Sequence, residues 1–187
     1  MRVITAPEPL DIKDDEIAVF LAGGITDCPN WQKKVIDRLG THIDCINLVV
    51  LNPRRKNFPI DDPNAAEEQI TWEFTALEQM DIFSMYFCSG NSDQPICMYE
   101  LGRNIVRMQM CFPVDWEDRI IIASEPNYRR VQDVIIQTAL ATGNKIDVRD
   151  VDGECAFSRY VYDIILSYQN LYCDYRDKHD KLSRKVR

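Results

Sequence analysis

One carboxylate, Glu100 in the stretch "ICMYELGRN", directly follows a run of apolar residues. It comes just after the expected start of a helix at about Pro95, and Cys97 and Asn104 share its helical face. A helix N-terminus stabilises a carboxylate, whereas burial raises its pKa, so the two effects oppose each other. A poorly solvated, ionised carboxylate is a good nucleophile or charge stabiliser for an electron-poor carbon. A first-turn acid that only complements the helix dipole has the same spacing, so both interpretations stay open.

A second carboxylate, Glu73, lies in the stretch "EEQITWEFTALEQM". It comes three residues after Ile70 and four before Leu77, on the apolar stripe that the helical period predicts: Ile70, Phe74, Leu77 and Met80. A carboxylate on such a face needs a partner or a function, because burying an unpaired charge is costly. Glu73 is therefore either a site residue or an acid paired with an arginine.

Two pairs of residues follow the first two expected strands. Gly23 and Gly24 in "AGGI" would let the backbone approach a ligand closely, although a plain turn has the same composition. Arg54 and Arg55 in "NPRR" could bind a phosphate or carboxylate, or pair with aspartates a few residues later. The chain has neither G-x-G-x-x-G nor a P-loop lysine, so the dinucleotide and nucleoside-triphosphate signatures are absent.

These residues must be positioned by an alternation of strands and helices. Near-continuous apolar runs of strand length alternate with helical patterns, which predicts a parallel sheet covered on both faces. We expect a flavodoxin-like (Rossmann-like) three-layer α/β fold with about five parallel strands in the order 2-1-3-4-5. In such sheets ligands bind at the carboxyl ends of the strands, where Glu100 and both pairs lie. The expected strands are 17–21, 46–51, 82–87, 119–124 and 145–148.

The length of 187 residues fits a single domain over 1–187, with a long C-terminal helix at about 155–175 and a basic tail at 176–187. The helix carries more apolar length than the edge of a small sheet can cover, which predicts a homo-oligomer. Leu171 and Tyr175 are at the far end of this pattern. Its other members are Phe157, Tyr160, Ile164 and Tyr168.

Composition excludes several classes of function. The net charge is −8, and the tail carries six basic and two acidic residues, which leaves −12 for residues 1–175. Such an acidic body would repel a phosphate backbone, so duplex nucleic acid is a poor partner. The apolar runs are too short for a membrane span and the N-terminus is no secretory signal, so we expect a cytoplasmic protein.

The cysteine and histidine patterns favour neither a disulfide framework nor a metal site. The seven cysteines include no Cys-x-x-Cys pair, and most lie in apolar segments, as reduced and buried thiols do. The two histidines, His42 and His179, lie far apart in the sequence. We expect no metal and no cofactor.

Four segments in order resemble one known family: "FLAGGITDCPNWQ", "LNPRR", "EQITWEFTALEQMDI" and "YELGR". Together, over roughly residues 17–124, they resemble the nucleoside 2-deoxyribosyltransferase-like family, which includes the 2′-deoxynucleoside 5′-phosphate N-hydrolases. The resemblance implies a flavodoxin-like fold. It also implies cleavage of the N-glycosidic bond of a deoxynucleoside or its monophosphate, by hydrolysis or by deoxyribosyl transfer.

The resemblance also implies roles for individual residues. Glu100 matches the nucleophile that attacks C1′ of the sugar and forms a glycosyl-enzyme intermediate. Glu73 lies eight residues before Asp81 and matches an acid that helps to hold the sugar or the base. The glycine loop maps onto Gly23, Gly24 and Ile25. Further candidates for substrate binding are Asn52, Arg54, Arg55, Trp72, Asp93 and Tyr99; Trp72 either stacks on a base or packs in the core.

One departure from the family pattern opens an alternative. The monophosphate hydrolases carry Ser-x-Gly before the glutamate, with the serine on the 5′-phosphate, and here Gln94 and Ile96 take those positions. Ser89, Ser92 or the arginines of "NPRR" would then have to bind a phosphate. The alternative function is a nucleotide- or ADP-ribose-type ligand sensor that has lost catalysis.

Overall fold

The computed structural model describes residues 1–42 and 47–185, and the side chains of residues 1–41 and 47–169. In this part of the chain, six parallel strands form one sheet in the order β1-β3-β2-β4-β5-β6. Every residue of β4 and β5 is buried, as expected for central strands that helices cover on both faces. The strands are β1 (Arg2–Thr5), β2 (Ile17–Gly23), β3 (Leu48–Asn52), β4 (Ile82–Phe87), β5 (Ile120–Ser124) and β6 (Arg149–Asp150).

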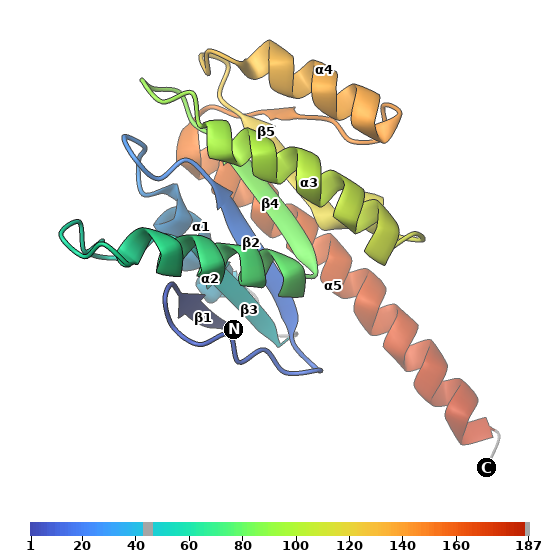
Figure 1. Ribbon diagram of the computed structural model, residues 1–187. Coiled ribbons are helices and arrows are strands. Elements are labelled where there is room, and N and C mark those ends of the chain that lie inside the picture. Colours follow the sequence, from blue (N-terminus) through green and yellow to red (C-terminus); the bar gives the residue numbers. More distant parts are fainter. Residues whose placement is uncertain (43–46, 186–187) are drawn as a thin grey trace.

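The helices form the two outer layers (Figure 1). α2, α3 and α4 cover one face of the sheet, and α1 and α5 cover the other, so each face has its own hydrophobic core. On the α1/α5 face, the rings of Trp31, Tyr86 and Phe157 pack together with centroids 4.6–5.4 Å apart. The helices are α1 (Trp31–His42), α2 (Ala65–Gln79), α3 (Pro95–Cys111), α4 (Val131–Thr142) and α5 (Gly153–Lys185), with a short 3-10 turn at Trp116–Arg119.

The three-layer flavodoxin-like arrangement is confirmed, and its strand order needs one correction. The five expected strands keep their relative order, but β1 adds a sixth strand at the edge, paired in parallel with β3. The sequence "RVIT" is too short to show a strand period, and only its pairing with β3 makes it a strand. The expected strand 46–51 begins at Leu48 in the structure, and Ile46 lies outside the described residues.

The last expected strand, 145–148, was also misplaced. The structure places β6 at Arg149–Asp150 instead. Ile146 is 8% exposed and Val148 packs against the α2/α3/α4 core. The apolar character of this segment thus reflects burial of side chains, which a loop crossing the core also achieves, and not pairing in the sheet.

α2 buries only the second half of its predicted apolar stripe, where Leu77 and Met80 lie in the core. Ile70 and Phe74 are 65% and 55% exposed, whereas Trp72 and Ala76 are buried. The Trp72 ring packs against Phe20 at 6.4 Å between centroids. A single large aromatic residue buries more area than either exposed side chain, so its packing sets the rotation of the helix.

α5 is longer than expected and continues through the basic tail to Lys185. Its described apolar side chains are largely used within the chain: Phe157 is fully buried and Tyr168 is 8% exposed, while Tyr160 and Ile164 are half-buried against the same core. Leu171 and Tyr175 lie outside the described side chains. Across the described residues, no helix has the length and apolar character needed to cross a membrane.

Candidate active site

A pocket of about 220 Å³ opens at the carboxyl ends of β2 and β4. Both acids singled out from the sequence, Glu73 and Glu100, line it. The remaining lining residues come from β2 and the glycine loop (Phe20, Ala22, Gly23, Gly24, Ile25 and Thr26), from Pro53, and from the start of α3 with the preceding loop (Ser92, Gln94, Pro95, Ile96 and Cys97).

The two glycines let the loop after β2 fit between its neighbours. Gly23 has φ +147°, and a Cβ there would lie 2.4 Å from the carbonyl oxygen of Tyr86 and 2.8 Å from the Trp31 ring. A Cβ on Gly24 would lie 2.4 Å from the sulfur of Cys28. Only glycine fits either position without displacing neighbours, so this loop lies against the end of β4 and forms one wall of the pocket.

Gln94 lines the pocket next to the glycine loop, with its Oε1 2.6 Å from the point where a Cβ on Gly24 would stand. It precedes α3 in the left-handed conformation (φ 48°, ψ 51°), and Pro95 begins the helix. The Gln94 side chain is 5% exposed, and its Nε2 donates a hydrogen bond to the carbonyl oxygen of Cys88 at 2.8 Å. Its Oε1 has no hydrogen-bond partner among the described residues. Gln94 therefore ties the start of α3 to the end of β4, and α3 places Glu100 in its second turn.

Glu73 is held from its own helix. The side chain of Gln69, one turn earlier on α2, donates a hydrogen bond from Nε2 to Oε1 of Glu73 at 2.7 Å. Arg55 Nε donates in turn to Oε1 of Gln69 at 2.5 Å. At the end of α2, Asp81 Oδ2 accepts the backbone N–H of Ala18 at 2.8 Å. This contact ties the segment between α2 and β4 to β2, which helps to fix the depth at which Glu73 enters the pocket.

The two carboxyl groups influence each other's protonation. Burial and the negative charge of Glu73 raise the pKa of Glu100, Arg103 opposes both, and together they bring it to about 8. Burial also raises the pKa of Glu73, but the hydrogen bond from Gln69 and the charge of Arg55 oppose that rise. At neutral pH the favoured state therefore places a proton on Glu100 beside an ionised Glu73.

The structure brings some of the other sequence candidates to this pocket and leaves others outside it. Gly23, Gly24 and Ile25 line it together with the two acids. Asn52 instead accepts the backbone N–H of Arg54 on its Oδ1 at 3.1 Å, just after β3. Arg54 itself donates to the carbonyl oxygens of Cys28 and Pro29. It therefore stabilises the segment that follows the glycine loop and leads to α1.

Arg55 lines an adjoining pocket of about 400 Å³, which shares Glu73 with the first. Asp93 is exposed and forms a 2.9 Å ion pair with Arg129. Tyr99 is 71% exposed. Neither of these two side chains lines the pocket that holds the two acids.

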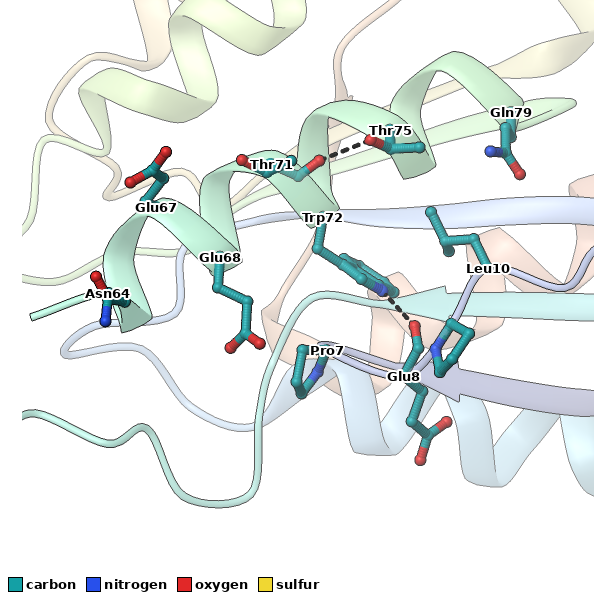
Figure 2. Close-up of a pocket in the computed structure, with 11 residues that line it drawn as sticks. Pro7, Glu8, Leu10, Asn64, Glu67, Glu68, Thr71, Trp72, Thr75 and Gln79 are labelled. Carbon is teal, nitrogen blue, oxygen red and sulfur yellow. Dashed lines mark hydrogen bonds between the residues drawn. The ribbon is translucent and has the colours of Figure 1, made fainter. Parts of the chain in front are cut away.

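Trp72 lies in a different pocket, of about 650 Å³, between α2 and the N-terminal loop (Figure 2). Its indole N–H donates to the carbonyl oxygen of Glu8 at 2.7 Å, as the dashed line in Figure 2 shows. With 7% exposure and a ring packed on Phe20, Trp72 occupies the core position that was one of its two expected roles.

Two pocket contacts were missed in the sequence. Gln69 was recognisable only by its spacing, four residues before Glu73 on one helix, which brings the two side chains together. Gln94 stood out only as a departure from a motif, and its buried position was not visible in the sequence. Of the two serines considered for a phosphate, Ser92 lines the pocket, whereas the hydroxyl and backbone N–H of Ser89 both donate to Glu125.

Comparison with known families supports the resemblance. A model of the family described as "Nucleoside 2-deoxyribosyltransferase like" matches residues 16–114, which include both acids and the glycine loop. The chain belongs to this family. No curated protein matched the chain. Membership gives the protein a general nucleoside deoxyribosyltransferase-like function and a small-molecule nucleoside as its class of substrate.

The part of the chain that the structure describes contains no cluster of side chains suited to a metal ion. No three or more His, Cys, Asp or Glu side chains gather there in an arrangement that could hold a metal ion.

Proposed function

We propose that the protein cleaves the N-glycosidic bond of a 2′-deoxynucleoside or its 5′-monophosphate, with Glu100 as the nucleophile and a glycosyl-enzyme intermediate. The observation that carries this proposal is the pairing of Glu100 with Glu73 in one pocket, which the glycine loop also lines. Cleavage builds positive charge on C1′, and a carboxylate beside that carbon stabilises the charge and can form an ester with it. Removing water from a carboxylate makes it a stronger nucleophile, as burial does for Glu100.

The protonation state of the pair supplies the second requirement of the reaction. The departing base must gain a proton, and at neutral pH the pair holds one on Glu100. As substrate fills the pocket, that proton passes to Glu73 and then to the base nitrogen, while the Glu100 carboxylate attacks C1′. One C–N bond breaks, one C–O ester bond forms, and the proton leaves with the base.

The second step decides between the two activities. Water attacks C1′ of the ester in a hydrolase, whereas a second base attacks it in a transferase. In both cases the C–O bond to Glu100 breaks and the carboxylate is regenerated. Glu73, by then ionised, accepts the proton that the water or the incoming base gives up.

The charges around the pocket favour a nucleoside over a monophosphate. The pocket is lined by two acids and by no lysine, arginine or histidine among the described residues. Arg54 is bonded to backbone carbonyls, and Arg55 to Gln69 and Glu68. A phosphate dianion would thus enter a pocket that two acids line without any basic side chain.

A substrate panel tests the proposal. The protein is incubated with deoxynucleosides and their monophosphates, with and without a free acceptor base, and base release is followed by chromatography. We expect Glu100→Gln to lower turnover by about 10³-fold or more, because the covalent step is lost. The matched control is Glu67→Gln, an exposed acid on α2 that should leave turnover unchanged. Turnover undiminished in Glu100→Gln would falsify the assigned nucleophile, and tight binding without any turnover would favour the ligand sensor.

We further propose that the protein is a homo-oligomer, assembled through α2 and α3. These neighbouring helices are linked by Arg103, whose guanidinium lies 4.3 Å from the centre of the Phe74 ring. Large apolar side chains on both helices are more than half exposed, and one of them, Ile96, also lines the pocket. Phe74→Asp should shift the sedimentation coefficient to that of a monomer; a wild-type chain that is monomeric at micromolar concentration would contradict the proposal. The exposed set is Ile70, Phe74, Ile96, Tyr99, Val106 and Met110.

A further inference from the structure

Two cysteine thiols meet directly behind the wall of the candidate active site. Cys28 ends the glycine loop that follows β2, and Cys88 immediately follows β4. Both are free thiols, Cys28 half-buried and Cys88 fully buried, and they share a hydrogen bond with each other. They are 60 residues apart in the sequence, so only the parallel pairing of β2 with β4 brings them together.

Each thiol touches a residue that lines the pocket. The sulfur of Cys28 lies 2.4 Å from the point where a Cβ on Gly24 would stand, and Oε1 of Gln94 lies 2.6 Å from that same point. Nε2 of Gln94 lies 3.7 Å from the sulfur of Cys88. Gly24 and Gln94 lie against each other in the pocket wall, so a movement of either sulfur is transmitted to both.

The two thiols differ in pKa and in exposure, as an attacking thiol and a resolving thiol do. The hydrogen bond from Cys88 and the positive charge of Arg54 lower the pKa of Cys28. The same hydrogen bond, together with burial, raises the pKa of Cys88. Arg54 lies close because its Nη2 donates to the carbonyl oxygen of Cys28 at 3.0 Å. Cys28 is thus the attacking thiolate and the more accessible sulfur, and Cys88 is the resolving thiol.

We propose that Cys28 and Cys88 form a reversible disulfide when the protein meets a peroxide, and that this bond reshapes the pocket beside Glu100. The Cys28 thiolate attacks hydrogen peroxide: an S–O bond forms, the O–O bond breaks, and hydroxide leaves and takes up a proton as water. The Cys88 thiol then attacks the resulting sulfenic acid: the S–S bond forms, the S–O bond breaks, and a second water leaves with the Cys88 proton. Two thiols lose two electrons and one peroxide becomes two waters.

The effect on the pocket follows from the shorter distance between the two sulfur atoms in a disulfide. A disulfide holds its sulfurs about 2.05 Å apart, which is much closer than two hydrogen-bonded thiols. Cys88 is fixed at the end of a fully buried strand, so Cys28 and its loop move towards it. Gly24 then loses its contact with the Cys28 sulfur, and Gln94 loses the contact of its Nε2 with the Cys88 sulfur. We expect kcat/KM for base release to fall at least tenfold, and this part of the inference rests on the proposed function.

The disulfide itself is tested without any turnover. The reduced full-length protein is treated with stoichiometric hydrogen peroxide, the remaining thiols are alkylated, and intact mass and peptide maps are recorded. We expect the loss of two hydrogens, a single cross-linked peptide joining Cys28 to Cys88, and full reversal by a thiol reductant. Cys28→Ser should abolish the cross-link, whereas Cys111→Ser, at an exposed cysteine at the end of α3, should leave it intact.

The coupling to the pocket has two readouts. Hydrogen exchange of residues 24–28 and 94–100 should differ between the reduced and oxidised protein, and it does not depend on activity. Base release should fall on oxidation in the wild type and not in Cys28→Ser. A cross-link between other cysteines, or oxidation of Cys28 to sulfinic acid without a cross-link, would overturn the disulfide. A cross-linked protein with unchanged hydrogen exchange would overturn the link to the pocket. A reduced protein without base release would count against the proposed function alone.

Discussion

Replacing Glu100 by glutamine should make the protein more stable, and the gain should depend on pH. The pKa of Glu100 rises from its ordinary value of 4.5 to about 8 because the folded chain removes water from the carboxyl group. Between these two pH values the folded state keeps a proton that the unfolded state gives up, so the free energy of unfolding falls as pH rises through this window. Glutamine has nearly the same shape and no charge, so the stability of the variant does not fall with this ionisation.

The magnitude follows from the width of the window. A difference of about 3.5 pH units corresponds to about 5 kcal/mol for a fully buried group. Because Glu100 remains partly exposed, solvent screens part of this cost, and we expect Glu100→Gln to be more stable than the wild type by about 2–4 kcal/mol at pH 9. At pH 4.5 and below, both side chains are neutral and the two proteins should have nearly equal stability.

Urea unfolding followed by circular dichroism between pH 4.5 and 9 measures this difference. Glu67→Gln, an exposed site on the same face of the sheet, serves as the control and should shift stability by less than about 0.5 kcal/mol at any pH. A Glu100→Gln curve parallel to the wild-type curve across the whole range would refute the argument, because it would mean that the carboxyl group is as well solvated in the folded protein as in the unfolded one.

Three further outcomes are expected. Glu73→Gln removes the negative charge that raises the pKa of Glu100, so the basic limb of the kcat/KM profile, where Glu100 loses the proton that the base needs, should move to lower pH although the maximal rate falls; an unmoved limb would mean that the two acids are uncoupled. Gly23→Ala should lower the free energy of unfolding in urea by about 2–4 kcal/mol, because its Cβ would meet the carbonyl oxygen of Tyr86. Trp72→Phe should cost about 1–2 kcal/mol in the same assay through its lost hydrogen bond, and should leave KM for the nucleoside unchanged; a raised KM would place the ring in the substrate site.

Much of the fold could be predicted because apolar periodicity is a local property. The alternation of buried strands with helical stretches predicted the parallel sheet, its two covered faces and the relative order of β2 to β5. The short strands at the edges could not be predicted, because β1 and β6 hold four and two residues, and pairing with a neighbour defines them more than any pattern of their own. The rotation of α2 was also missed, since Trp72 outweighed the regular spacing of Ile70 and Phe74.

For the site, the sequence by itself determined the chemical groups and the edge of the sheet at which they lie. Glu100 and the glycine loop follow the carboxyl ends of parallel strands, and topology gathers them at one edge, whereas the spacing of Glu73 predicted only its face of the helix. Only the tertiary structure decided which side chains enter the pocket and in what charge state. The depth of burial and the contact of Cys28 with Cys88 depend on segments far apart, and no local pattern in the chain encodes them. The bond from Gln69 to Glu73 follows the local i, i+4 spacing, but its place at the pocket depends on the rotation of α2.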